Sequence, residues 1–247
     1  MGMMLITGAG RGIGAATARL AAASGYAVAV NYINDGGAAE KVVTDIRHGG
    51  GTASAIQGNV AEEAGVLQLF SQAEAELGPL SVLVNNAAIT GGFARVDQVT
   101  HAMATRLFAT NVIGAMICAR EAVLRLSTRH GGSGGSIINI SSQAAVIGGA
   151  GEWVHYAATK GAINTFTIGL AKEVAAEGIR VNAVSPGLIE TDMHAAAGAP
   201  DRARRLARGI PMGRPGTPEE VARTVLWLAS ASASYITAAI VPASGGR

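Results

Sequence analysis

Short apolar runs alternate along the chain with longer segments in which apolar residues recur at helical spacing. The short runs are β-branched or otherwise apolar and are bounded by Gly, Asn, Ser or Pro, which is typical of buried strands. We predict strands at 3–7, 27–32, 53–57, 82–85, 136–140, 180–184 and 236–241. We predict helices near 13–24, 36–48, 62–77, 99–128, 152–177 and 217–230.

This alternation of strand and helix predicts right-handed βαβ units. The expected fold class is α/β: a three-layer, doubly wound Rossmann fold with a seven-stranded, mostly parallel sheet flanked by helices. No linker or repeat divides the sequence, so residues 1–247 are predicted to form a single domain. The segment 187–213 lacks a clear strand and carries Gly, Pro and several Arg residues, so we expect a functional insertion or lid there, called the substrate loop below.

Composition and charge exclude several classes of protein. Hydrophobic residues make up 49% of the chain but aromatic residues only 4%, so the core must consist of Ala, Val, Ile and Leu. A net charge of +2 without a Lys/Arg block argues against nucleic-acid binding. We see no signal peptide or membrane helix and expect a cytoplasmic protein. The single cysteine, Cys118, rules out an internal disulfide and is expected to be a buried packing residue.

A glycine-rich turn follows the first predicted strand. Residues 8–14 read Gly-Ala-Gly-Arg-Gly-Ile-Gly and lead directly into a predicted helix. Small residues let the backbone approach a pyrophosphate, and the N–H groups at the helix N-terminus then face the anion. An ordinary tight turn also needs glycine, but the strand–turn–helix context favours a dinucleotide site.

Five motifs, in order along nearly the whole chain, resemble those of the short-chain dehydrogenase/reductase family. They are Thr7-Gly8-x3-Gly12-x-Gly14, Asn85-Asn86-Ala87-Ala88, the strand 136–142 ending at Ser142, Tyr156-x3-Lys160, and the segment 182–191. The resemblance, closest to the 3-oxoacyl-carrier-protein reductase and sugar dehydrogenase branch, implies an oxidoreductase. Such an enzyme moves a hydride between a nicotinamide and a carbonyl or alcohol.

The resemblance also implies a catalytic set of Asn111, Ser142, Tyr156 and Lys160. Tyr156 and Lys160 are four apart on a predicted helix and share a face. An ammonium near a phenol lowers the phenol's pKa, so we expect Tyr156 to exchange a proton with the substrate oxygen. By resemblance, Ser142 holds that oxygen, Lys160 also binds the nicotinamide ribose, and Asn111 anchors a water in a relay through Lys160.

Each of these residues taken alone is more often an ordinary helix, cap or loop residue. Their joint occurrence behind the glycine turn favours catalysis. The alternative is a non-catalytic dinucleotide-binding sensor or scaffold, which has no use for a proton-transfer tyrosine. An epimerase or dehydratase with the same Tyr–Lys pair would normally need a larger C-terminal domain.

Three positions depart from the family pattern. Ser142 and Tyr156 are one residue further apart than in many relatives, which the glycine-rich loop 148–151 can absorb, and Ser141 is the fallback serine. Asn59 stands where the family often has Asp beside the adenine. Ala238 replaces a common Gly in the last strand, where it is expected to alter local packing.

The expected cofactor is NADP, and no metal site is expected. Tyr32 stands where an acid would bind the ribose 2′-hydroxyl, and Arg11 is placed to pair with a 2′-phosphate. Ile33 and Asp35 favour NAD instead. The full set of expected cofactor contacts is Gly8, Arg11, Gly12, Ile13, Gly14, Tyr32, Asn59, Val60, Asn86, Ala87, Tyr156, Lys160, Pro186, Gly187, Ile189 and Thr191.

The substrate is expected between residues 143–155 and the substrate loop. Gln143, Glu152, Trp153 and His155 offer a mixed wall that suits a sugar, a small ketone or a 3-oxoacyl group, although Trp153 and His155 equally suit packing.

A basic cluster of Arg202, Arg204, Arg205 and Arg208 is read as a solvated helix face or as an attractor for an acidic substrate or carrier protein. The helices at 99–128 and 152–177 are apolar around much of their circumference, which predicts a homo-oligomer, a dimer or tetramer.

Overall fold

The sheet and its helices are described by a computed structural model that covers residues 2–193 and 197–247. Seven strands form one sheet in the order β3-β2-β1-β4-β5-β6-β7, and every neighbouring pair is parallel. The strands are β1 (Met3–Ile6), β2 (Ala27–Tyr32), β3 (Ala53–Gln57), β4 (Leu80–Asn85), β5 (Gly135–Ile140), β6 (Ile179–Pro186) and β7 (Ile240–Ala243). The predicted fold class is confirmed.

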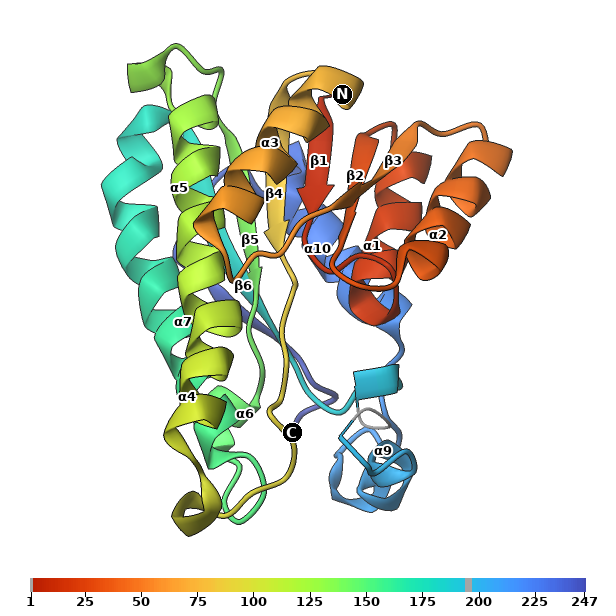
Figure 1. The fold of residues 1–247 in the computed structure, drawn as a ribbon, viewed down its shortest axis with the longest axis vertical. Helices are drawn as coiled ribbons and strands as arrows, with labels where there is room; N and C mark the ends of the chain where they lie inside the picture. Colours follow the sequence, from red (N-terminus) through yellow and green to blue (C-terminus); the bar gives the residue numbers. More distant parts are fainter. Residues whose placement is uncertain (1, 194–196) are drawn as a thin grey trace.

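Helices cover both faces of this sheet (Figure 1). One face carries α1 (Gly12–Ala23), α2 (Gly36–His48) and α10 (Pro218–Ala229). The other carries α3 (Glu63–Leu77), α5 (Gly114–Leu126) and α7 (Val154–Val174). The short helices α4 (His101–Phe108), α6 (Ala144–Ile147) and α9 (Arg202–Arg205) lie toward the carboxyl ends of the strands, at the bottom of Figure 1.

Burial on both sides explains why the strands are continuous apolar runs. In β1, Met4 and Ile6 join the core under α1, α2 and α10, whereas Met3 and Leu5 join the core under α3, α5 and α7. All four side chains are fully buried. The sheet is therefore a rigid platform whose strand ends hold whatever follows them.

Two predicted elements differ from the structure. The helix predicted at 99–128 is broken by a π-helical turn, Ala109–Ile113, because the Asn111 side chain inside it bonds to the backbone of Ile89. The last strand begins at Ile240 rather than at 236. Ala238 adopts a left-handed φ of 62°, which a regular strand excludes.

One stretch of the described residues, His101–Leu126, is long and apolar enough to cross a membrane by length and composition alone. It consists of α4, the π turn and α5. Its α5 portion packs on β4 and α3, and Cys118, Ala119 and Ala122 belong to the core there. This packing is that of a core helix, and it leaves Cys118 1% exposed, as predicted.

Candidate active site

The order of the strands reverses between β1 and β4, and the glycine turn lies at that point. Ligands of open parallel sheets bind beyond the carboxyl ends of the strands at such a reversal. Thr7 and Asn86 join the two strand ends. Asn86 Nδ2 donates to the carbonyl oxygens of Thr7 and Gly8, both at 2.9 Å, and Thr7 Oγ1 accepts from the N–H groups of Asn86 and Ala87.

The turn requires glycine for two reasons: backbone angles that other residues rarely adopt, and a lack of room for a Cβ atom. Gly8 and Gly12 have left-handed φ values of 62° and 54°. A Cβ on Gly14 would lie 2.6 Å from Asn86 Nδ2 and 2.7 Å from the Gly8 carbonyl oxygen, so no side chain fits there. These contacts keep the turn narrow and leave its outer side open.

A cavity of about 260 Å³ lies on that open side. Its walls include Arg11 and Gly12 of the turn and Glu190 and Thr191 of the substrate loop. The N-terminal N–H groups of α1 and the glycine backbone are the kind of donors that a pyrophosphate requires. The residues present therefore fit a dinucleotide.

The end of β2 is positioned by Asn31. Its Oδ1 accepts from the Gly8 N–H at 3.1 Å, and its Nδ2 donates to the Gly58 carbonyl at 3.0 Å, so Asn31 links β2, β3 and the glycine turn. Tyr32 follows, with its ring against Gly36 at the start of α2. Asp35 accepts the N–H of Ala38 and so caps α2.

The remaining expected cofactor residues are spread over one edge of the sheet. Asn59 follows β3, where its side chain bonds to Glu62 and to the N–H of Ala61, and Val60 is next to it. Ile13 is the second residue of α1 and is partly buried against the core beneath that helix.

Three more expected residues lie at or just after the end of β6. Pro186 ends the strand, Gly187 donates its N–H to Ala243, and Ile189 forms a parallel bridge with Gly216. The structure thus places these expected residues at the same strand-end edge as the glycine turn.

Ser142 and Tyr156 meet beyond the end of β5. The Ser142 side chain acts on the Tyr156 phenol as a hydrogen-bond partner that lowers the pKa of Tyr156, and the Ala144 N–H donates to Ser142 Oγ at 3.1 Å. Ser141 instead bonds to Asn164 and to the Lys160 carbonyl, so its hydroxyl is engaged elsewhere. The loop between Ser142 and Tyr156 turns through three glycines with left-handed φ values, at 148, 149 and 151.

Lys160 lies beneath Tyr156 on α7. Its Nζ donates to the Ile140 carbonyl at 2.6 Å and lies 5.7 Å from the centre of the Tyr156 ring. Burial lowers the pKa of Lys160 to about 8. Burial also raises the pKa of Tyr156 to about 12, against a smaller lowering by the Ser142 hydrogen bond. The expected lowering of the Tyr156 pKa by Lys160 is therefore wrong for the protein alone, since desolvation dominates.

Asn111 lies in the π turn and is 2% exposed. Its Oδ1 accepts from the Ile89 N–H at 2.9 Å, and its Nδ2 donates to the Ile89 carbonyl and to Thr159 Oγ1. Thr159 precedes Lys160 on α7. Asn111 thus ties the loop after β4 to the helix that carries Tyr156 and Lys160.

The expected substrate wall is mostly packed. Gln143 donates to Ser185, and His155 Nε2 donates to the Gly92 carbonyl, so both are buried positioning groups. Trp153 is 6% exposed and packs with Tyr156. Arg202 is also buried, which corrects the interpretation of all four arginines as a solvated cluster.

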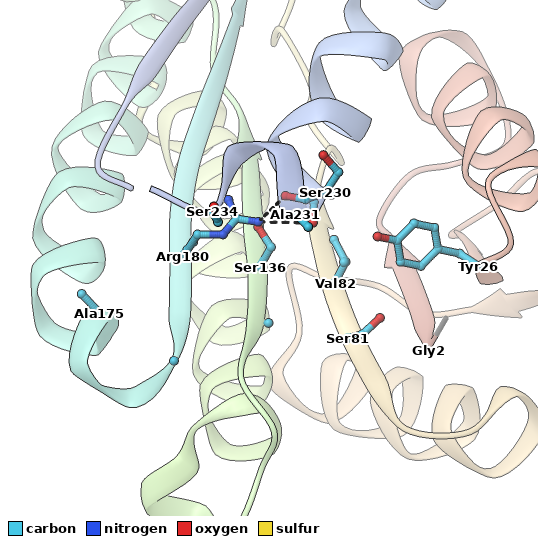
Figure 2. Close-up of a pocket in the computed structure, with 13 residues that line it drawn as sticks. Gly2, Tyr26, Ser81, Val82, Ser136, Ala175, Arg180, Ser230, Ala231 and Ser234 are labelled. Carbon is cyan, nitrogen blue, oxygen red and sulfur yellow. Dashed lines mark hydrogen bonds between the residues drawn. The ribbon is translucent and has the colours of Figure 1, made fainter. Parts of the chain in front are cut away.

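A second cavity, of about 590 Å³, lies at the opposite edge, against the amino ends of the strands. Figure 2 shows Arg180, Ser136 and Tyr26 among the residues around it. Arg180 donates to the carbonyl oxygens of Leu228, Ala229 and Ser230 at the end of α10. That arrangement caps a helix, and the cavity holds none of the expected catalytic residues.

Sequence reasoning missed Asn31, Thr159 and Phe93 as parts of the site. Asn31 follows a run of apolar residues inside a buried strand, and a lone amide in that position signals a buried hydrogen bond. Phe93 gave no signal, because its contact with Trp153 joins two loops that are far apart in the sequence.

Comparisons with known proteins agree with this geometry. Residues 8–247 match a family model described as enoyl-(acyl carrier protein) reductase. The chain is 47% identical to the uncharacterized oxidoreductase YgfF of Escherichia coli, with all of both chains covered. It is 40% identical to a 3-oxoacyl-[acyl-carrier-protein] reductase of Synechocystis, over 98% of this chain and 95% of the relative.

A solved structure extends the likeness to three dimensions. The short-chain dehydrogenase/reductase of Serratia marcescens superposes with a TM-score of 0.91 at 33% identity. The superposition covers 99% of this chain and 97% of the other.

Proposed function

Because this chain belongs to the short-chain dehydrogenase/reductase family of oxidoreductases, we propose that it transfers a hydride between NADP(H) and a carbonyl or secondary alcohol, with Tyr156 as general acid and base. The observation that carries the proposal is the juxtaposition of Ser142, Tyr156 and Lys160, with Lys160 Nζ 5.7 Å from the centre of the Tyr156 ring, at the strand edge that also holds the glycine turn.

The protein's own groups handle the proton. In the reductive direction the Tyr156 hydroxyl donates its proton to the substrate oxygen, where negative charge develops, and Ser142 Oγ donates a hydrogen bond to the same oxygen. In the oxidative direction Tyr156 takes the proton back. The bound nicotinamide supplies or accepts the hydride.

Residues at one edge of the sheet are proposed to hold the cofactor. The glycine turn and the start of α1 bind the pyrophosphate, and Lys160 binds the nicotinamide ribose. Thr191 lies over the turn, since a Cβ on Gly12 would lie 3.4 Å from Thr191 Cγ2, and Ile189 precedes it in the same segment. Asn111 is proposed to take part in the proton relay. Its side-chain amide bonds both to Ile89, in the loop after β4, and to Thr159, the residue before Lys160.

The proposed preference for NADP rests on charge. Among the described residues, no hydrogen bond or ion pair engages the exposed Arg11 side chain, whereas Asp35 is occupied as the cap of α2. For a 2′-phosphate near Tyr32, Arg11 is therefore a cation that no described carboxylate already pairs with. The Asp35 carboxylate, which would repel the phosphate, is already hydrogen-bonded to the backbone of α2.

We further propose a cytoplasmic homo-oligomer, a dimer or tetramer. Phe108, Ile113, Met116 and Ile168 on α4, the π turn, α5 and α7 are each more than a third exposed. A second copy that covers this apolar face would remove it from water. Burial raises the pKa of the lone Cys118 thiol to about 12, which keeps it unreactive.

A carbonyl and alcohol panel tests the proposed function. Small ketones, 3-oxoacyl thioesters and keto sugars are offered with NADPH, and secondary alcohols and sugars with NADP. We expect turnover of at least one pair, and a loss of about 10²- to 10⁴-fold in kcat for Tyr156→Phe with unchanged NADPH binding. Tyr235→Phe, at a fully exposed tyrosine, is the control. Tight NADPH binding without turnover across the panel would favour the non-catalytic sensor or scaffold.

A further inference from the structure

Three aromatic rings lie against one another beside the proposed catalytic group. The Phe93 and Trp153 rings are stacked, with centroids 4.9 Å apart and planes 12° apart. The Trp153 ring meets the Tyr156 ring edge-on, with centroids 5.9 Å apart. Trp153 is therefore the ring that connects the loop after β4 to the Tyr156 phenol.

Arg202 of α9 completes this group from the substrate loop. Its guanidinium carbon lies 4.4 Å from the centre of the Trp153 ring and 5.9 Å from that of Phe93. Its Nη2 donates to a carboxylate oxygen of Glu152, the neighbour of Trp153. The Arg202 side chain is only 9% exposed.

The neighbouring Arg205 behaves differently. Its side chain is 62% exposed and pairs with Asp201 within its own turn of the chain. Burial of a guanidinium is costly unless charge and ring contacts offset it. Arg202 has both kinds of contact, since it pairs with the Glu152 carboxylate and its guanidinium packs against the rings of Trp153 and Phe93. Of these two arginines, Arg202 is therefore packed against the site and Arg205 is not.

We propose that Arg202 is a positioning residue, which holds Trp153 against Tyr156 and thereby fixes the orientation of the phenol toward the substrate. This proposal deepens, and rests on, the proposed role of Tyr156 in proton transfer. Arg202 acts through Trp153, so it contributes to kcat rather than to cofactor affinity. The substrate loop is thereby coupled to the chemistry by one buried side chain.

Fluorescence in a Trp227→Phe background tests the contact, because Trp153 is then the single tryptophan. Arg202→Met removes the charge and keeps the length of the side chain. We expect its Trp153 emission to shift to longer wavelength and its acrylamide quenching to rise at least twofold. Arg202→Lys should restore most of the original emission. Arg205→Met, which removes a charge from the same helix, should leave it unchanged. Equal spectra for Arg202→Met and Arg205→Met would overturn the proposal.

Kinetics test the consequence for the proton-transfer group. We expect Arg202→Met to lower kcat about tenfold, with the dissociation constant of NADPH within twofold of the original, and Arg202→Lys to recover part of the loss. A shifted emission with an unaltered kcat would refute the positioning role. If the unsubstituted protein turns over no carbonyl, the proposed function fails by itself, and the fluorescence comparison still decides whether Arg202 holds Trp153.

Discussion

Lys160 Nζ lies 5.7 Å from the centre of the Tyr156 ring and donates its hydrogen bond to the Ile140 carbonyl rather than to the phenol. Burial acts on the two groups in opposite directions, since it lowers the pKa of Lys160 to about 8 and raises that of Tyr156 to about 12. Both groups are thereby held in their neutral forms more readily than in water. The Tyr156 hydroxyl therefore keeps its proton at neutral pH.

Replacement of Lys160 by Met should change how stability depends on pH. The folded pKa of about 8 lies below the ordinary value of 10.5, so the charged form costs stability in full below pH 8, and the cost is relieved as pH rises toward 10.5. Relative to Lys160→Met, the original protein should gain about 2 kcal/mol of unfolding free energy between pH 7 and 10. Urea unfolding at several pH values measures this gain.

The control for that measurement is Lys172→Met, at an exposed lysine on the same helix. It should follow the original protein at every pH. Parallel pH profiles for the original protein and Lys160→Met would show that burial does not depress the lysine's pKa.

Reversal of charge at Arg11 tests the cofactor preference. Arg11→Glu should raise the dissociation constant of NADPH about tenfold or more, because a charge-assisted contact is replaced by repulsion, and should leave that of NADH nearly unchanged. Arg95→Glu is the matched control, since Arg95 lies on an exposed loop. Equal losses for both cofactors would argue against a 2′-phosphate at this position.

Ala238→Gly should stabilise the fold. Ala238 has a left-handed φ of 62°, at which an L side chain costs about 1–2 kcal/mol and glycine costs little. After the loss of backbone entropy is subtracted, we expect about 0.5–1 kcal/mol more unfolding free energy. Ala239→Gly, at a residue without a positive φ, should destabilise instead. A thermal unfolding series distinguishes the two, and a fall in Tm for Ala238→Gly would contradict the expectation.

Arg180→Met should destabilise the protein and spare its chemistry. Arg180 holds the last carbonyls of α10 through its two Nη atoms, and hydrogen bonds to a charged group are worth about 1.5–3 kcal/mol each. We expect a loss of about 2–4 kcal/mol in unfolding free energy, since several carbonyls lose a donor and water replaces it only in part. The expected kcat is unchanged, because the cavity beside Arg180 lies at the far edge of the sheet. Arg223→Met, exposed on α10, is the control.

The sequence by itself determined the layers, the glycine turn and the order of the motifs. Short apolar runs that lack alternation and are bounded by turn residues indicate strands buried on both faces. Gly8 and Gly12 adopt left-handed φ values, and Gly14 leaves no room for a Cβ. The Tyr156–Lys160 spacing follows from the helix period alone.

Only the tertiary structure decided how these groups behave. Burial, which no local pattern measures, reversed the expected direction of the Tyr156 pKa. Asn111 broke a helix that its neighbours favour, because its partner Ile89 comes from another loop. Arg202 and Trp153 are 49 positions apart in the sequence, so their contact exists only once the sheet has brought the substrate loop over α7. Each of these effects depends on desolvation or on distant partners, and both arise only when the chain is folded.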